Sequence, residues 1–176
     1  REDEGVIVGW MGSASTLKYL SHLMPALGRV AQRCPKLRLK IVCDRFLESP
    51  LLRVINKPWF SEEEITDLQS FDIGIMPLSD DLWSRGKCAL KILQYFGVGV
   101  PVVCSPVGMN REIVEHGVNG FWAATEEEWE ERLVELIESR ELRHEMGLRG
   151  RRKVEGNYTV AVNAPRILKV LKQVTG

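Results

Sequence analysis

Three basic side chains lie close together near the middle of the sequence. Arg85, Lys87 and Lys91 belong to residues 85–94, whose pattern is typical of a helix start. Because Lys87 and Lys91 are four residues apart, a helix would carry both on one face near its amino-terminal end. Like charges at this spacing cost about 0.2–0.5 kcal/mol, and a cation at this end of a helix costs about 0.3–1 kcal/mol. A bound diphosphate would turn these costs into attraction, because free N–H groups at a helix amino terminus bind anions.

Apolar runs flank this segment on both sides. Residues 71–77 predict a strand that is buried on both faces, and residues 97–103 end a helix and open the next buried strand. The sequence therefore predicts a helix that begins beside the carboxyl end of a strand, which is where open α/β sheets bind ligands. The alternative is that the lysines are solvated residues on the exposed edge of a helix.

A second candidate phosphate position lies near the start of the chain. A turn through Gly12 and Ser13 leads into a predicted helix over residues 16–33, and Lys18 lies in its first turn. Gly12 permits a close backbone approach, and Ser13 or Ser15 can cap the helix. The turn matches neither G-x-G-x-x-G nor the P-loop, so a glycine with a purely structural role is an equal alternative.

The sequence alternates strands with helices and then continues in helices alone. Strands are predicted at residues 6–10, 37–43, 52–55, 71–77, 101–104 and 118–122, and helices at residues 16–33, from 61, 110–116, from 125, 142–154 and 160–174. The helices from Ser61 and Thr125 begin with capping boxes. This order predicts an α/β fold with a mainly parallel sheet that is covered on both faces, right-handed crossovers and extra C-terminal helices.

Trp59 lies just beyond the carboxyl end of the strand predicted at residues 52–55. Its ring could flank a nucleobase in a ligand site at that end of the sheet. The alternative is that Trp59 packs on the neighbouring helix, in line with the general tendency of tryptophan to be buried.

The charge balance and the composition limit the classes of function. The 24 basic and 24 acidic residues give a formal net charge of zero, which argues against a general nucleic-acid binder because such proteins rely on a basic surplus. A chain of 176 residues with 44% hydrophobic residues can bury one core, so we expect a single domain over residues 1–176. The sequence has no apolar run of about 18 residues and no signal peptide, so we expect no transmembrane segment.

The cysteines and histidines do not form a metal-binding pattern. No cysteine has C-x-x-C spacing, and the histidines are scattered along the chain. We expect buried free thiols in a reducing cytoplasm, since two of the cysteines lie in strand-like apolar runs. The cysteines are Cys34, Cys43, Cys88 and Cys104. Because the first predicted strand begins almost at once, we also expect the chain to be a piece of a longer protein.

Several segments together resemble one enzyme family. They are residues 86–103, the run EIVEHGVNGF at residues 112–121, and the tail from Trp129 through LRHEMG at residues 142–147 to NYT at residues 157–159. In this order and spacing they are similar to the C-terminal half of the group 1 (family 4) glycosyltransferases. With the turn at residues 9–13, the resemblance covers nearly the whole chain.

The resemblance implies a GT-B enzyme, in which two Rossmann-like domains face each other across a cleft. This chain would be the C-terminal domain, a Rossmann-like three-layer αβα sandwich that binds the nucleotide-sugar donor. The N-terminal domain, which mostly binds the acceptor, would be a partner absent from this chain. The implied reaction is transfer of a sugar from a UDP-, GDP- or ADP-sugar to an unknown acceptor with retention of configuration. No cofactor or metal is implied, and the implied location is cytoplasmic, with peripheral membrane association of the full-length protein as an option.

The resemblance also implies roles for particular residues. In the family, the turn after the first strand and a nearby basic pair contact the donor diphosphate. By this analogy Gly12, Ser13 and Lys18 lie on one side of the phosphates and Lys87 lies on the other. The expected donor-binding residues are Gly12, Ser13, Lys18, Trp59, Arg85, Lys87, Lys91 and Gln94. No nucleophile–base pair is recognisable, so no catalytic residue is assigned.

The chain departs from the family at a pair of glutamates. The family carries a Glu, seven residues and a second Glu, which touch the donor sugar and the ribose, and these positions are Gly86 and Gln94 here. Gln94 can still form hydrogen bonds with ribose hydroxyls. Gly86 has no side chain, so the contact with the donor sugar is missing or moves to Arg85 or Lys87.

Two other functions compete with glycosyl transfer. A nucleotide-sugar epimerase would need acid–base groups that converge on the sugar, and the replacement of both glutamates argues against it. A non-catalytic nucleotide-binding or interaction module is favoured if these replacements abolish turnover. If the chain is half of a two-domain enzyme, it is expected to be inactive alone and to expose an apolar or aromatic patch where its partner domain docks.

Overall fold

The computed structural model of the chain describes residues 5–175 and has a six-stranded parallel sheet at its centre. The strand order is β3-β2-β1-β4-β5-β6, so the sheet grows outward from β1 in one direction and then from β4 in the other. Every pair of neighbouring strands is parallel, which confirms the predicted sheet. The strands are β1 (Val6–Met11), β2 (Leu37–Val42), β3 (Val54–Lys57), β4 (Ile73–Met76), β5 (Val102–Cys104) and β6 (Gly120–Trp122).

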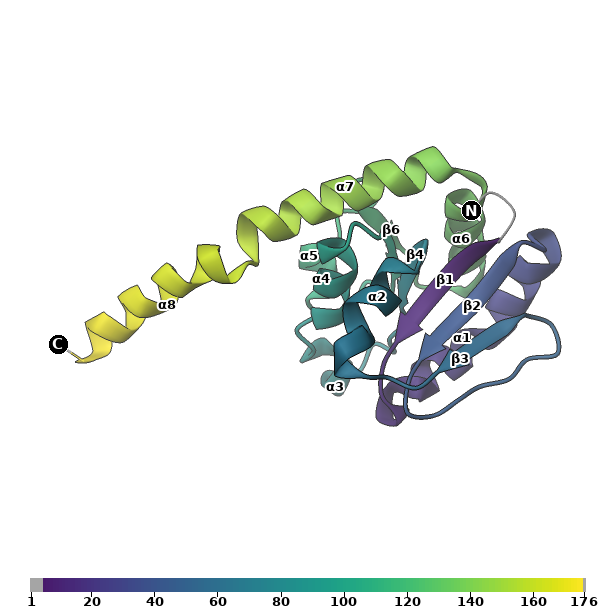
Figure 1. Cartoon of the computed structure of the whole chain (residues 1–176), viewed down its shortest axis with the longest axis horizontal. Helices are drawn as coiled ribbons and strands as arrows, with labels where there is room; N and C mark the ends of the chain where they lie inside the picture. The colour runs from purple at the N-terminus through teal and green to yellow at the C-terminus, as the bar shows by residue number, and fades with distance from the viewer. Residues whose placement is uncertain (1–4, 176) are drawn as a thin grey trace.

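Helices cover both faces of the sheet (Figure 1). One face packs against α1 (Leu17–Arg33) and α6 (Glu126–Glu138). The other face packs against α2 (Glu64–Gln69), α4 (Leu90–Gly97) and α5 (Asn110–Ile113). The fold is therefore a Rossmann-like α/β sandwich, as expected.

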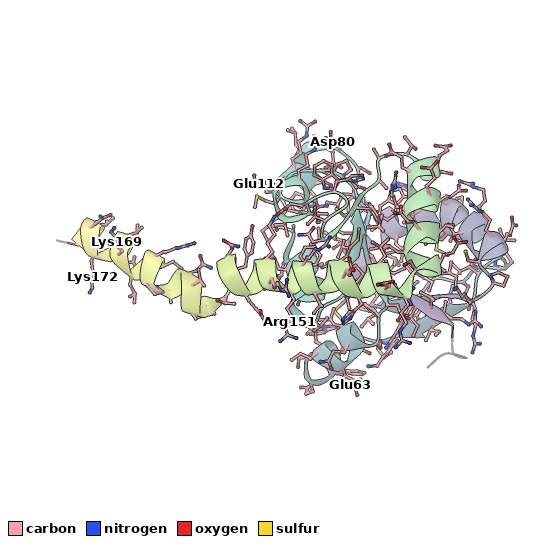
Figure 2. The ribbon with its side chains drawn as sticks, turned by 90° about the horizontal axis from the view of Figure 1, so that it is seen from above. Glu63, Asp80, Glu112, Arg151, Lys169 and Lys172 are labelled. Carbon is pink, nitrogen blue, oxygen red and sulfur yellow. The ribbon has the colours of Figure 1, made fainter. Side chains whose placement is uncertain are left out.

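Two further helices follow these layers. In Figure 1, α7 (Arg140–Asn157) crosses the end of the domain, and α8 (Val160–Thr175) continues away from it. Lys169 and Lys172 lie at the far end of α8, well apart from the body of the domain (Figure 2). Within residues 5–175, no helix has both the length and the apolar character that are needed to cross a bilayer.

Of the two predicted capping boxes, the structure forms one and not the other. The capping box at Thr125 is formed as predicted, because Thr125 Oγ1 accepts from Glu128 N and the Glu128 carboxylate accepts from Thr125 N. The capping box at Ser61 is wrong. Ser61 lies inside a short 3₁₀ turn, η2 (Ser61–Glu63), whose cap position is Phe60 and has no side-chain hydrogen bond. Glu64 is therefore the first residue of α2, and its carboxylate does not take part in a capping box.

The central lysines do not share a helix face, which corrects another expectation. The helix α4 begins at Leu90, after Ala89 adopts a left-handed conformation with φ of 54°. Lys87 precedes this kink, in the connection that follows the short helix α3 (Leu82–Arg85), whereas Lys91 lies in the first turn of α4. The spacing of four residues consequently does not place Lys87 and Lys91 one helical turn apart.

The cysteines are buried with one exception. Cys34, Cys43 and Cys104 are buried and free, as expected, whereas Cys88 is exposed. Cys88 lies in the same irregular connection as Lys87, outside any strand or helix. Its exposure follows from the position of this connection at the surface, which the apolar pattern of the sequence does not reveal.

One buried hydroxyl ties α4 to the carboxyl end of the first strand. Tyr95 is completely buried, and its hydroxyl accepts a hydrogen bond of 3.1 Å from Met11 N. Burial raises the pKa of Tyr95, so the hydroxyl stays protonated. Gly74 on β4 makes room for the ring, because a Cβ at this position would lie 2.6 Å from a Tyr95 ring carbon. This contact fixes α4 beside the carboxyl end of β1.

A buried carboxylate holds α2 against β2 and β3. Asp67 is 2% exposed and accepts hydrogen bonds from Lys40 Nζ on β2 (2.8 Å) and Lys57 Nζ on β3 (2.5 Å). Burial alone would raise the pKa of Asp67, but the bonds from both lysines outweigh it and lower the pKa. The ion pairs therefore set the position of α2 relative to the sheet edge.

Replacement of this carboxylate is expected to destabilise the domain. Asp67→Asn should lower the free energy of unfolding by about 3 kcal/mol at neutral pH, because it removes the counter-charge of the partly buried Lys40 and leaves Lys57 with Glu63 alone. Since the folded pKa of Asp67 lies below its unfolded value, this contribution is present above roughly pH 4 and is lost as the pH falls through the folded pKa. Urea unfolding at pH 7 and at pH 3 measures both effects.

A matched control is Glu131→Gln. Glu131 also pairs with a cation, Arg132, but at 3.9 Å and with its side chain 66% exposed. Its replacement should change the free energy of unfolding by less than about 0.5 kcal/mol. Equal effects of the two substitutions would contradict the role given to Asp67.

Candidate functional site

A cavity of about 720 Å³ lies at the carboxyl ends of β1 and β4, where the strand order reverses direction. Ligands bind at this position in open α/β sheets because loops from both halves of the fold meet there. The walls come from segments that are far apart in the sequence. They are Met11 at the end of β1, Gly12 and Ser13 after it, Asp44 after β2, Pro58 and Trp59 after β3, Glu64 on α2, Met76 on β4, residues 86–89, and Leu90, Lys91 and Gln94 on α4.

The structure brings most of the expected site residues together around this cavity. Those that line it are Gly12, Ser13, Trp59, Lys87, Lys91 and Gln94. Lys18 and Arg85 do not line it. The ammonium of Lys18 lies 5.0 Å from the centre of the Tyr19 ring, and Arg85 Nε donates to Asp80 Oδ1 at 2.6 Å.

Lys87 and Lys91 bring positive charge to the cavity without an acidic partner. Within residues 5–175, neither ammonium forms a hydrogen bond or an ion pair with the protein. Lys87 Nζ instead lies 5.8 Å and 5.9 Å from the ring centres of Tyr19 and Trp83. Lys91 is half-buried, and burial followed by repulsion from Lys87 lowers its pKa. An anion in the cavity would relieve both costs.

The glycine turn after β1 contributes less to anion binding than its sequence suggests. Its N–H groups already have acceptors within the protein, which are Val42 O for Gly12 (3.0 Å), Thr16 Oγ1 for Ser13 (3.3 Å) and Asp44 Oδ1 for Ala14 (2.7 Å). Gly12 also has a packing role, because a Cβ there would lie 2.3 Å from the Trp10 ring. The turn therefore shapes the cavity wall, while the positive charge comes from the two lysines.

Asp44 is a residue of the cavity that sequence reasoning missed. Hydrogen bonds from the Cys43 thiol and from Ala14 N lower the pKa of Asp44, so the carboxylate stays charged. It thus occupies the amino end of the short helix η1 (Ala14–Thr16), where a phosphate could otherwise bind. The position of Asp44 directly after a parallel strand was the available signal, because the carboxyl ends of parallel strands meet at one edge of a sheet.

Glu64 is the second cavity residue that sequence reasoning missed. Trp59 Nε1 donates to Glu64 Oε2 at 3.0 Å, and Gln94 Nε2 donates to Glu64 Oε1 at 2.9 Å. Trp59 thus lines the cavity and contacts α2 through this hydrogen bond, but it is 46% exposed and not buried against the helix. No sequence pattern links Glu64 to Gln94, because their contact depends on how α2 packs beside α4.

Exposed apolar side chains border the cavity. Leu82 and Trp83 on α3 are 87% and 75% exposed, and Leu90 at the start of α4 is 58% exposed. The Trp83 ring lies near the Lys87 ammonium, so this patch adjoins the positive part of the cavity. Within residues 5–175, no group of three or more His, Cys, Asp or Glu side chains is arranged to hold a metal ion.

Comparison with known proteins identifies similar families and folds. A family model described as glycosyl transferases group 1 matches residues 5–139. HepE from Anabaena, in complex with UDP and glucose, has a TM-score of 0.80 and 19% identity, and the match covers 97% of this chain and 49% of that chain. The C-terminal domain of the group 1 glycosyl transferase LpcC from Francisella tularensis has a TM-score of 0.73 and 17% identity, and the match covers 90% of this chain and 89% of that chain. A comparison with curated proteins gives no match.

A third solved structure shows the same relation in a longer protein. A mutant of TarM from S. aureus, in complex with fondaparinux, alpha-GlcNAc-glycerol and UDP, has a TM-score of 0.76 and 14% identity, and the match covers 94% of this chain and 35% of that chain. The chain thus spans about half the length of HepE, about a third of TarM and most of the LpcC domain. These structures share the fold of this chain.

The unpaired lysine on α4 is expected to reduce the stability of the ligand-free protein. Lys91→Met should raise the melting temperature by about 1–2 °C, which corresponds to about 0.5 kcal/mol in a domain of this size. Because the folded pKa of Lys91 is lowered, the penalty is complete below that pKa and disappears as the pH rises toward the unfolded value of about 10.4. Thermal unfolding at pH 7 and near pH 10 measures this difference.

Lys172→Met is the control for this prediction. Lys172 lies at the far end of α8 and is exposed (Figure 2). Its replacement should leave the melting temperature unchanged at both pH values. A lower melting temperature for Lys91→Met than for the unmodified protein would show that the charge of Lys91 is not a cost.

Proposed function

The chain belongs to the group 1 glycosyltransferases, and from this premise we propose that it binds the nucleoside diphosphate-sugar donor of such an enzyme. The observation that carries the proposal is the pair Lys87 and Lys91, which line a cavity at the carboxyl edge of the sheet and have no acidic partner among the residues that the structure describes. Unpaired cations that are kept at a cost to stability are typical of a site whose ligand is an anion.

The shape of the cavity supports a particular orientation of the donor. The diphosphate lies against Lys87 and Lys91, where the positive charge is concentrated. The nucleoside then extends along α4 past Gln94 toward Trp59, whose ring is 46% exposed and available for stacking. In this orientation the sugar lies near Gly86, which lines the cavity but has no side chain to bind it.

The proposed reaction is transfer of the sugar from the donor to an acceptor with retention of configuration. The bond between the anomeric carbon and the diphosphate oxygen breaks, and negative charge develops on the departing nucleoside diphosphate. A bond from the acceptor to the anomeric carbon forms in its place, and the acceptor's proton passes to the departing phosphate. Lys87 and Lys91 stabilise the developing negative charge, and a well-placed donor of this kind lowers a barrier by about 3–4 kcal/mol. Neither lysine acts as a proton donor in this scheme, and no residue of this chain is assigned as acid or base.

The acceptor is proposed to bind on a second domain that is not part of this chain. HepE and TarM are about two and three times as long as the part matched here. The exposed side chains of Leu82, Trp83 and Leu90 beside the cavity provide an apolar surface on which such a domain would dock. A donor-binding domain alone would bind nucleotide without turnover.

A specific observation also favours a second candidate, a non-catalytic nucleotide-binding module. Gly86 replaces a side chain at the part of the cavity where the donor sugar would lie. If this loss abolishes sugar transfer, the domain would still bind nucleotide through its lysines. Turnover of UDP-, GDP- or ADP-sugars by the full-length protein separates the two candidates.

The proposal predicts that Lys87 is needed for nucleotide binding. Isothermal titration with UDP, GDP and ADP should detect binding of at least one of them. For that nucleotide, Lys87→Ala should weaken affinity about five- to tenfold, because it removes a charge-assisted contact with the phosphates. The loss should be of similar size for inorganic pyrophosphate, since the contact does not involve the base or the ribose.

Lys18→Ala is a matched control, because Lys18 is close in the fold but does not line the cavity. Its replacement should change affinity less than twofold. Absence of binding for all three nucleotides would overturn the proposed function. Unchanged affinity in Lys87→Ala would overturn the assignment of the diphosphate to this part of the cavity.

A further inference from the structure

The cavity carries negative charge as well as positive charge, and the negative charge of Glu64 is not neutralised. Two neighbouring acids on this segment share a cationic partner, since Lys57 Nζ lies 2.5 Å from a carboxylate oxygen of both Glu63 and Asp67. Glu64 has no ion pair within residues 5–175. Among the described residues, its hydrogen-bond partners are two neutral donors, the indole of Trp59 and the amide of Gln94.

This arrangement leaves the carboxylate ready for further hydrogen bonds. Each carboxylate oxygen has two lone-pair positions, and one on each oxygen is used by Trp59 or Gln94. Glu64 lines the cavity, so the remaining positions are available to a ligand there. A pair of neighbouring hydroxyl groups supplies two O–H donors at the spacing of two carboxylate oxygens, so a vicinal diol fits this site.

The position of Glu64 relative to Lys91 specifies which diol. Gln94 follows Lys91 by three residues on α4, so their side chains are neighbours on one helix face, with Cβ atoms about 5–6 Å apart. A ligand whose phosphate contacts Lys91 therefore has its next chemical group beside Gln94 and Glu64. In a nucleoside diphosphate the next group is the ribose, whose 2′ and 3′ hydroxyls form a vicinal diol.

The carboxylate is held firmly enough to be selective. Asp67 lies one helical turn after Glu64 on α2, and its bonds to Lys40 and Lys57 fix α2 against the sheet. Trp59 and Gln94 then orient the carboxylate from two sides. A buried or partly buried acceptor that is held in this way loses a strong hydrogen bond when the ligand lacks the matching hydroxyl.

We infer that Glu64 accepts hydrogen bonds from the 2′ and 3′ hydroxyls of the donor ribose, and that Trp59 and Gln94 position its carboxylate. This inference rests on the proposed binding of a nucleoside diphosphate. It assigns the recognition of ribose to a carboxylate on α2, while Gln94 on α4 acts through that carboxylate. The neutral Gln94 suits this role, because a second carboxylate at its position would repel Glu64 across 2.9 Å.

The test compares ribonucleotides with deoxyribonucleotides. Isothermal titration is performed with the nucleoside diphosphate that binds best among UDP, GDP and ADP, with its 2′-deoxy counterpart, and with inorganic pyrophosphate. The unmodified protein should prefer the ribonucleotide about tenfold or more, since a hydrogen bond to a charged acceptor is lost with the hydroxyl. Glu64→Gln should reduce this preference to about twofold or less, and its affinity for pyrophosphate should stay the same or increase.

Asp44→Asn is the matched control, because Asp44 is the other carboxylate of the cavity. It should keep the tenfold preference for ribose, although removal of its negative charge can strengthen binding of every phosphate compound. Failure of the unmodified protein to bind any nucleoside diphosphate would overturn the proposed function together with this inference.

Three other outcomes would overturn this inference alone. They are an unchanged ribose preference in Glu64→Gln, a loss of that preference in Asp44→Asn instead, and an equal weakening of pyrophosphate binding in Glu64→Gln. The last outcome would show that Glu64 supports the structure of the cavity and does not contact ribose.

Discussion

The candidate site depends on the contact between the buried Tyr95 hydroxyl and Met11 N. β1 and α4 are separated by almost half of the chain, yet this bond fixes the second half of α4 beside the carboxyl end of β1. Gly74 permits the contact, because any side chain there would overlap the Tyr95 ring. The cavity then forms between two segments whose relative position is set within the core. A polar site can therefore keep its shape although its own charged groups repel one another.

The fold could be predicted from the sequence because its signals are local and repeated. Apolar runs such as residues 71–77, caps such as Thr125, and the alternation of strands with helices each depend on a few neighbouring residues. The site could be predicted only in part. The approach of Gln94 to Glu64 depends on how two helices pack. The left-handed residue that separates Lys87 from α4 is Ala89, and the sequence gives no sign of this conformation because the position is not a glycine. Such features arise from tertiary contacts that no short pattern contains.

Charged side chains that support the cavity are paired with opposite charges, whereas the lysines that line the cavity are not paired with an acid of the described residues. Asp67 is buried and neutralised by Lys40 and Lys57, so its charge contributes to stability. Lys91 is half-buried and has no ion-pair partner in the described part of the chain, and its lowered pKa reflects a cost. Both kinds of charged group lie at the same edge of the sheet. The difference separates residues that hold the cavity in shape from residues whose partner is expected to be a ligand.

The two ends of the cavity are also supported independently of each other. Glu64 is carried by α2, which is anchored to β2 and β3, whereas Lys87 belongs to an irregular connection between α3 and α4. Asp81 caps α3 by accepting from Ser84 N at 2.7 Å, and this bond limits where the connection can begin. A change in the connection would therefore alter the position of Lys87 while Glu64 stays in place. In a domain of this design, the end of the cavity at Lys87 can vary while the end at Glu64 is kept. Gly86, which has no side chain, is at the same end of the cavity as Lys87, because both residues lie in the connection between α3 and α4.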